Sequence, residues 1–141
     1  MSRLLFLFLF IANTLFAAQQ YGNVFVDEVT SIYDGDTFRV SIKDYPAIIG
    51  NRVAIRVNGI DTPEIRAKCK KEKLLARKAK QFTVNFLRTS KVIELRNIQR
   101  GKYFRIVADV YGDGVNLTTE LIKHKLGVAY DGGKKSKNWC N

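Results

Sequence analysis

The stretch Arg52–Glu64 constrains the fold of this chain more than any other, because a strand runs directly into a rigid acidic turn. Val53, Ile55 and Val57 alternate with polar or small residues, which is the pattern of a half-buried strand. Pro63 fixes its own φ and restricts the residue before it to extended conformations. Asp61 and Glu64 lie three residues apart on this turn. Their carboxylates repel each other unless a cation or strong donors lie between them. These residues are also ordinary turn formers, so a solvated turn is the alternative.

The first eighteen residues have the composition of a secretory signal peptide. Arg3 precedes an apolar run from Leu4 to Phe16, and two alanines follow. A short basic start, an apolar run of this length and small residues are typical of a signal sequence, and the run is too short to span a bilayer comfortably. An uncleaved anchor is the weaker alternative. We therefore expect a signal peptide over 1–18 and one domain over 19–141, without a membrane span in the mature form.

Charge and cysteine content agree with an exported protein that meets an acidic partner. The 141 residues carry a formal net charge of +11, which is typical of proteins that bind nucleic acid, anionic lipid or acidic glycans, and charge alone does not choose among them. Cys69 and Cys140 form an even pair, which predicts a disulfide in an exported chain. Two cysteines and the single His124 are too few for an ordinary zinc site. We expect a periplasmic or secreted protein.

Alternation and helical periodicity divide the chain into strands and helices. The predicted strands are Val24–Tyr33, Thr37–Ile42, Arg52–Ile60, Lys91–Asn97 and Tyr103–Tyr111. The predicted helices are 69–88 and Leu117–Leu126. We expect Asn116 to cap the second helix. Five strands with a helix after the third and another after the fifth predict an α+β fold, namely a five-stranded oligonucleotide-binding-type β-barrel with two main helices.

Four short motifs that can carry chemistry follow one another along the chain. They are Tyr33-Asp34-Gly35-Asp36-Thr37, Arg56, Asp61-Thr62-Pro63-Glu64 and Lys102-Tyr103-Phe104-Arg105. This set resembles the thermonuclease family of staphylococcal-nuclease-like domains, whose signature couples a DGDT turn, an arginine before DTPE and a KYxR strand. The resemblance covers roughly Val24 to Tyr130. A single Asp-Gly turn is weak evidence, whereas the whole set in this order is specific.

The resemblance implies a calcium-dependent nuclease that hydrolyses DNA and RNA with little sequence specificity and leaves 3′-phosphate ends. It makes Asp36 and Asp61 carboxylate ligands of Ca²⁺, with the backbone carbonyl of Thr62 as a further ligand. Glu64 would act on the attacking water, either as a general base or as an orienting group. Such chemistry agrees with the residue types, because a cation with oxygen ligands supplies Lewis acidity and a template for phosphodiester hydrolysis.

The same resemblance assigns the phosphate and the nucleotide to further residues. Arg56 and Arg105 would grip the phosphate, for which a planar guanidinium that binds two oxygens at once is well suited. Lys102, Tyr103 and Tyr130 would line the nucleotide pocket. The alternative for the arginines is pairing with carboxylates inside the barrel, and the alternative for the tyrosines is ordinary packing. The functional interpretation is favoured for five residues, because these chemically required groups occur together: Asp36, Arg56, Asp61, Glu64 and Arg105. For Tyr130 the two interpretations stay equally open.

Two other functions are compatible with parts of the sequence. A nucleic-acid-binding barrel without catalysis has the same fold, but related domains of that kind lose the acids and arginines that are present here. A basic protein that docks on anionic lipid or glycan through the lysine-rich helix 69–88 is the other, although we interpret most of those lysines as a solubilising surface. Nothing in the sequence implies a stable protein partner, and we expect a monomer.

Three departures from the family pattern concern substrate preference more than chemistry. Phe104 replaces the glycine that is common in the KYGR version of the strand motif. The segment after Glu64 runs directly into Cys69, which shortens a substrate-facing loop. The tail after Tyr130 is too short for a long terminal helix, so we expect the cysteine bridge to fix the end of the chain.

Overall fold

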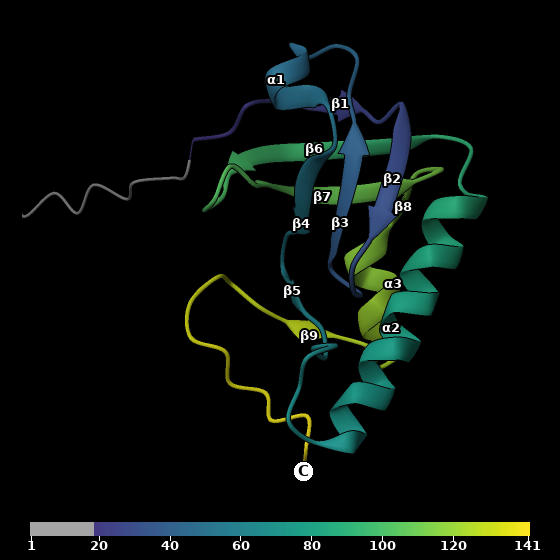
Figure 1. Cartoon of the computed structure of the whole chain (residues 1–141), viewed down its shortest axis with the longest axis vertical. Coiled ribbons are helices and arrows are strands. Elements are labelled where there is room, and N and C mark those ends of the chain that lie inside the picture. Colours follow the sequence, from purple (N-terminus) through teal and green to yellow (C-terminus); the bar gives the residue numbers. More distant parts are fainter. Residues whose placement is uncertain (1–18) are drawn as a thin grey trace, which may run out of the picture.

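The structure is a computed structural model that describes residues 19–141, so the expected signal peptide over 1–18 lies outside the described residues. A curled mixed sheet forms its centre, a long helix lies along one side, and a two-stranded sheet lies beneath (Figure 1). The predicted α+β architecture of the oligonucleotide-binding type is confirmed. None of the helices in the described part of the chain is long and apolar enough to cross a membrane.

The main sheet is antiparallel except at one pair of strands. Its order is β1-β6-β7-β4-β3-β2, with β8 paired to β7, and the second sheet pairs β5 with β9. The strands are β1 Val24–Phe25, β2 Glu28–Ile32, β3 Thr37–Ser41, β4 Val53–Val57, β5 Ile60–Asp61, β6 Ile93–Arg100, β7 Ile106–Gly112, β8 Val115–Asn116 and β9 Val128–Ala129. The exception is the parallel pair β4 and β7, which places the ends of two distant segments side by side.

Two predicted strands are divided in the structure. The first separates into β1 and β2, because β1 pairs with β6 while β2 pairs with β3. The third separates into β4 and β5 at Gly59, whose φ of +76° is a conformation that favours glycine. Sheet register then sets up the site, because Thr37 on β3 lies opposite Arg56 on β4.

Three helices accompany the sheets, namely α1 Ala47–Gly50, α2 Lys70–Thr89 and α3 Leu117–Lys123. Helix α2 begins after Cys69, whose sulfur accepts a hydrogen bond from the backbone of Glu72. Asn116 caps α3 as predicted, through a 3.0 Å hydrogen bond from the Thr119 amide. Helix α3 ends at Lys123, before the predicted end at Leu126, because Lys125 adopts a left-handed φ of +58°.

The buried face of α2 is rotated from the one that the periodicity predicts, which contains Leu75, Ala79, Phe82 and Phe86. The structure buries Ala76, Ala79, Thr83 and Leu87. Leu75 is half-buried, and Phe82 and Phe86 pack half-buried against the core. Small side chains let the helix approach the turn before β3 closely. A Cβ atom on Gly35 would lie 2.9 Å from that of Ala79, and the Thr83 hydroxyl donates a 2.7 Å hydrogen bond to the Gly35 carbonyl. Helix α2 therefore holds this turn in place.

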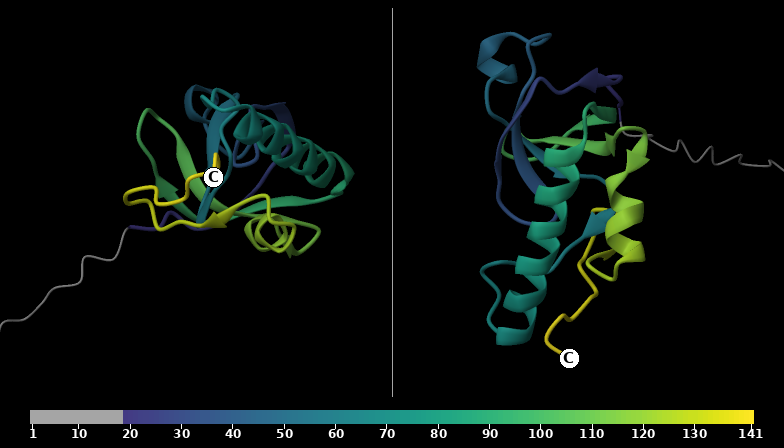
Figure 2. Two further views of the ribbon diagram at one scale, coloured as in Figure 1. Left: turned by 90° about the horizontal axis from the view of Figure 1, so that it is seen from below. Right: turned by 90° about the vertical axis from the view of Figure 1, so that its right-hand side faces the viewer.

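The tail after β9 lacks regular structure but is fixed at its far end. Cys69 and Cys140 form a disulfide with Cα atoms 6.0 Å apart, and the side chain of Trp139 is buried. The C-terminus consequently lies beside the start of α2, as two further views show (Figure 2). The tail passes the acidic turn that follows β5 on its way to the disulfide.

Candidate active site

A cavity of about 740 Å³ opens where the turn before β3, the end of β4 and the β6–β7 hairpin meet. Most of the predicted site residues line it, namely Asp36, Arg56, Thr62, Glu64, Lys102, Arg105 and Tyr130. Asp61 lines a neighbouring cavity of about 410 Å³ that shares Thr62 and Glu64 with the first. Tyr103 lines neither cavity, and 94% of its surface is exposed. The fold thus gathers the acids and arginines but leaves Tyr103 outside.

Asp36 and Arg56 form a largely buried ion pair in the wall of the main cavity. The Asp36 Oδ2 atom lies 2.7 Å from an Arg56 guanidinium nitrogen, and only 7% and 14% of the two side chains are exposed. Arg56 also donates to the carbonyl of Ile60 at 2.9 Å. This arrangement is the pairing that the sequence left open as the alternative role of Arg56. The guanidinium is held rigidly, with its charge directed at Asp36.

Asp36 also connects the two acidic turns. The amide of Thr62 donates to Asp36 Oδ2 at 3.0 Å, and the hydroxyl of Thr37 donates to Oδ1 at 3.0 Å. Because Thr62 directly follows Asp61, the first predicted carboxylate ligand lies against the backbone that carries the second. The turns are therefore adjacent, as a shared cation would require.

Asp34, the first acid of the DGDT turn, is a further buried member of this cluster. Its Oδ1 atom accepts a 3.1 Å hydrogen bond from the Asp36 amide. Burial, followed by the neighbouring Asp36 carboxylate, raises the pKa of Asp34 to about 7. The hydrogen bond and the Arg56 charge act in the opposite direction without cancelling these effects. Asp34 therefore adds negative potential to the turn only when it loses its proton.

Asp61 and Glu64 share a cation that the sequence did not predict. The ammonium of Lys135 lies 2.8 Å from Asp61 Oδ1 and 2.7 Å from Glu64 Oε1. Burial acts to lower the pKa of Lys135, but the contacts with Asp61 and Glu64 outweigh it and raise the pKa above its ordinary value. The contact with Asp61 is close in distance but poorly aligned, and Oδ1 has no satisfactory hydrogen bond. It is an ion pair rather than a directed hydrogen bond.

The predicted acids do not form a single tight cluster. Within residues 19–141, the one group of three acidic or sulfur ligands whose atoms approach within 4.8 Å is Cys69, Glu72 and Cys140. Both sulfurs of that group are bonded to each other, so they are not available as thiolate ligands. The predicted ligands Asp36 and Asp61 are instead adjacent through the Thr62 backbone and neutralised by different cationic side chains.

The donor set nevertheless suits a hard cation. Asp61 is 3% exposed and Thr62 is 2% exposed, and neither Asp61 Oδ1 nor the Thr62 hydroxyl has a hydrogen-bond partner among the described residues. Lys135 neutralises Asp61 through an ion pair rather than a directed hydrogen bond, and a buried oxygen without a hydrogen bond is costly. Carboxylate and carbonyl oxygens are also the ligands that calcium prefers. These residues therefore fit a calcium ion by their chemistry.

Arg105 differs from Arg56 because it has no ion-pair partner among residues 19–141. Its side chain is half-buried, it lines the main cavity, and its Nε atom is buried without a hydrogen bond. The parallel pairing of β4 with β7 places Arg56 opposite Val107, two residues after Arg105, and both arginines line the same cavity. A guanidinium in this state is available to an anion that enters the cavity.

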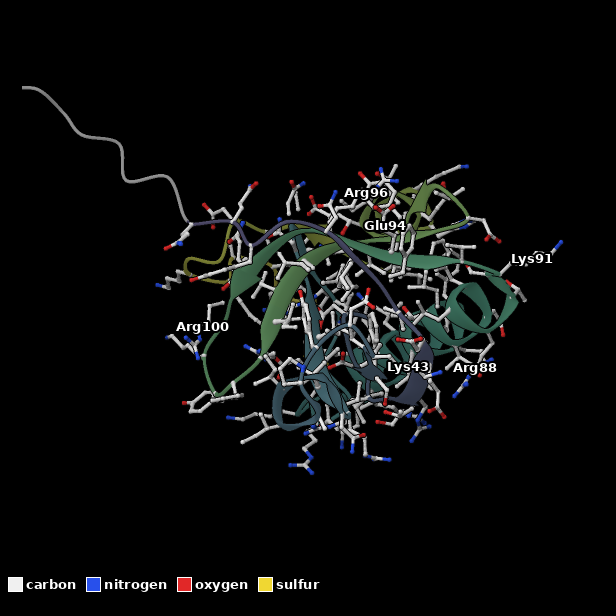
Figure 3. All side chains as sticks on the ribbon, turned by 90° about the horizontal axis from the view of Figure 1, so that it is seen from above. Lys43, Arg88, Lys91, Glu94, Arg96 and Arg100 are labelled. Atoms are coloured by element: carbon white, nitrogen blue, oxygen red, sulfur yellow. A yellow bond between two sulfur atoms is a disulfide. The ribbon has the colours of Figure 1, made fainter. Side chains whose placement is uncertain are left out.

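The β6–β7 hairpin that carries Arg105 turns within the predicted strand Tyr103–Tyr111, so β7 begins only at Ile106. The Arg105 amide donates to the Lys102 carbonyl at 3.2 Å, so Tyr103 and Phe104 occupy the central positions of the turn. Their φ angles of +57° and +62° are those of a type I′ turn, which normally takes Asn and Gly. Arg100 lies at the edge of the molecule beside this hairpin (Figure 3), 5.7 Å from the Phe104 ring.

Tyr130 is held in the wall of the cavity. Its amide donates to the Gly59 carbonyl at 3.1 Å, and its hydroxyl donates to the Gly133 carbonyl at 2.6 Å. The residue thereby connects the β4–β5 turn to the tail. A lining position with the ring partly exposed is compatible with either of its predicted roles, pocket wall or packing.

Comparison with known families agrees with this geometry. The fold and the site together define the class of this protein as a small barrel whose cavity is rich in acidic residues and arginines. The model of the family described as staphylococcal nuclease homologue matches residues 54–138, which is more than half of the chain. The chain therefore belongs to the staphylococcal nuclease homologue family, a nuclease-type family. The match includes Arg56, the DTPE turn and Arg105, while the turn with Asp36 precedes it. Among curated proteins, none is significantly similar to this chain.

Proposed function

We propose that the mature chain is an exported, calcium-dependent nuclease that hydrolyses phosphodiester bonds of DNA and RNA with little sequence specificity and leaves 3′-phosphate ends. Membership of the nuclease-type family supports the reaction class. The observation that carries the proposal is the half-buried Arg105, which has no ion-pair partner among residues 19–141 and shares one cavity with the buried Asp36–Arg56 pair. A free guanidinium beside buried acids is suited to a phosphate and a cation together.

Arg105 is the residue that would receive the phosphate. Its charge is permanent and its planar nitrogens can bind two phosphate oxygens at once. Arg56 would reach the same phosphate from a fixed position, because Asp36 and the Ile60 carbonyl hold its guanidinium. Charge that accumulates on the phosphoryl oxygens during attack would be stabilised by both groups, of which Arg56 is already held in place.

Asp36, Asp61 and the carbonyl of Thr62 would hold calcium. When bound, the ion supplies Lewis acidity and neutralises charge on a phosphate oxygen. Glu64 is more than half exposed and lines the main cavity, so it can contact a water molecule there. It would accept a proton from that water or orient it for attack.

Export is part of the proposal. The disulfide between Cys69 and Cys140 supports an oxidising compartment, and the composition of residues 1–18 supports a signal peptide. The destination would be the periplasm or the exterior of the cell. Nucleic acid would be the partner that the net charge of +11 attracts.

The test is hydrolysis of a defined oligonucleotide by residues 19–141. Single-stranded DNA and RNA are incubated with calcium, with magnesium and with chelator, and the new ends are identified by mass spectrometry. We expect cleavage in calcium, none in chelator, and 3′-phosphate products. Equal rates in calcium and chelator would contradict the metal dependence. Salt-sensitive binding without any cleavage would instead support the non-catalytic barrel, and binding to anionic vesicles alone would support the docking protein.

A further inference from the structure

Lys135 belongs to the tail, yet its ammonium lies between two acids of the turn after β5. It is 2.8 Å from Asp61 Oδ1 and 2.7 Å from Glu64 Oε1. Asp61 is almost completely buried, whereas 44% of the Lys135 side chain is exposed. A buried carboxylate without a positive partner is strongly unfavourable. Lys135 therefore supplies the positive charge that Asp61 requires in this state of the protein.

The disulfide keeps Lys135 close to these acids. Glu64 stands five residues before Cys69, and Lys135 stands five residues before Cys140. The two short segments 64–69 and 135–140 are therefore joined at one end by the disulfide and at the other end by the contact of Lys135 with Glu64. Burial of Trp139 and a hydrogen bond from Lys71 to the Asn141 carbonyl hold the same end of the tail. A tethered ammonium acts at a high effective concentration.

We propose that Lys135 is a positioning residue that neutralises Asp61 and Glu64 and competes with a divalent cation for Asp61. The inference deepens the proposed function and rests on its calcium site. Calcium binds oxygen at about 2.3–2.6 Å, and an ammonium 2.8 Å from the same Asp61 oxygen would repel it strongly. Because much of the side chain faces solvent, Lys135 can move away when the ion binds. In the absence of calcium, Lys135 thereby keeps Asp61 and Glu64 paired with a positive charge.

The first test measures calcium binding rather than activity. Calcium is titrated by calorimetry into the wild type, Lys135→Gln and Lys134→Gln, which removes the same charge from an exposed neighbouring position. Losing one charge-assisted contact predicts about tenfold tighter calcium binding by Lys135→Gln. Lys134→Gln should change the affinity by less than about twofold, as expected for an exposed charge. Equal effects of the two substitutions, or weaker binding by Lys135→Gln, would overturn the inference.

The second test uses the unmodified sequence of residues 19–141. Lysine acetylation by an amine-reactive reagent is followed by mass spectrometry, in chelator and in calcium. We expect Lys135 to react at least about threefold more slowly than Lys134 in chelator, because its ammonium is held by two carboxylates. Calcium should raise the rate at Lys135 and leave Lys134 unchanged. Equal rates in chelator, or a calcium-induced decrease at Lys135, would contradict the inference.

The disulfide offers a further check. The double variant Cys69→Ser and Cys140→Ser releases the tail without altering charge, so it should bind calcium more tightly, as Lys135→Gln does. Calcium affinity equal to that of the wild type would show that the tether does not hold Lys135 in place. Calcium-dependent cleavage without any effect of Lys135 would overturn this inference alone. Displacement of Lys135 by calcium without cleavage of nucleic acid would overturn the proposed nuclease activity alone.

Discussion

The Asp36 carboxylate lies 2.7 Å from the Arg56 guanidinium, and both side chains are largely buried. The first predicted calcium ligand and the first predicted phosphate-binding group therefore neutralise each other before any ligand arrives. Removing one member leaves the other as an uncompensated buried charge. The pair contributes to stability as well as to the site, and the two roles can be separated by measurement.

The first prediction concerns this ion pair. Replacing Arg56 with Met should lower the free energy of unfolding by about 3 kcal/mol, because Asp36 then remains buried without its cation. The double variant Asp36→Asn and Arg56→Met removes both charges of the pair and should recover more than about 1 kcal/mol of that loss. Urea unfolding in the presence of chelator measures both. Equal losses in the single and double variants would show that the ion pair is not the cause.

Arg105 should behave differently, because it has no ion-pair partner in the part of the chain that the structure describes. Arg105→Ala should reduce kcat by about 10²-fold or more if the residue stabilises charge on the phosphate, with an unfolding midpoint close to that of the wild type. Arg105→Lys should recover only part of the rate, since a lysine lacks the planar fork. Cleavage of a labelled oligonucleotide and thermal unfolding give the two values.

The matched control for Arg105 is Arg88→Ala. Arg88 is exposed near the end of α2, far from Arg100 and the hairpin beside it (Figure 3). Its removal changes the net charge equally but should change the rate by less than about twofold at moderate salt. Similar losses in the two variants would indicate that Arg105 acts through general attraction of the polyanion.

The hairpin turn allows a prediction about stability. Phe104 has a φ of +62°, which costs a residue with a Cβ atom roughly 1 kcal/mol or more relative to glycine. Phe104→Gly should therefore be more stable than Phe104→Ala by about 1 kcal/mol, since both lose the ring that faces Arg100. Chemical unfolding of the two variants isolates the backbone effect. Equal stability of the variants would mean that the turn relaxes when the ring is removed.

The sequence predicts those parts of the fold that depend on local patterns. Strict alternation identifies β3 and β4, and the Asn116 side chain marks the start of α3. Hydrophobicity predicts the buried face of α2 only in part, because Phe82 and Phe86 do pack against the core but the closest contact of the helix uses the smallest side chains. Ala79 lies against Gly35, and this approach turns the larger apolar residues toward the rim of the core.

The same distinction applies to the site. Asp36 and Arg56 meet through the register of neighbouring strands, and their motifs predict both of them. Lys135 has no local signal, because it is one of several lysines in the tail. The related feature of the sequence is a spacing: Lys135 stands as many residues before Cys140 as Glu64 stands before Cys69. Such a contact depends on a disulfide and not on a motif, so sequence reasoning missed it.

Asp113 supports a prediction about pH at a position outside the site. Its carboxylate accepts hydrogen bonds from the amides of Lys91 and Val92, and these bonds hold the start of β6 against the β7–β8 turn. The hydrogen bonds from Val92 and Lys91 lower the pKa of Asp113 from its ordinary value of 3.8. A lowered pKa in the folded protein means that the carboxylate stabilises the fold above pH 3.8. This stabilisation is lost as the pH falls through the lowered value.

Asp113→Asn should therefore have a lower unfolding temperature than the wild type at neutral pH, and the difference should disappear in acid. Asparagine keeps one side-chain oxygen for the Val92 and Lys91 amides and tolerates the left-handed φ of +48° at this position, so the substitution removes the charge with little change to the backbone. Thermal unfolding from pH 7 to pH 2 measures the difference, with the exposed Asp44→Asn as a control of equal charge change. A difference that stays constant down to pH 2, or one that Asp44→Asn reproduces, would contradict the role of the Asp113 carboxylate.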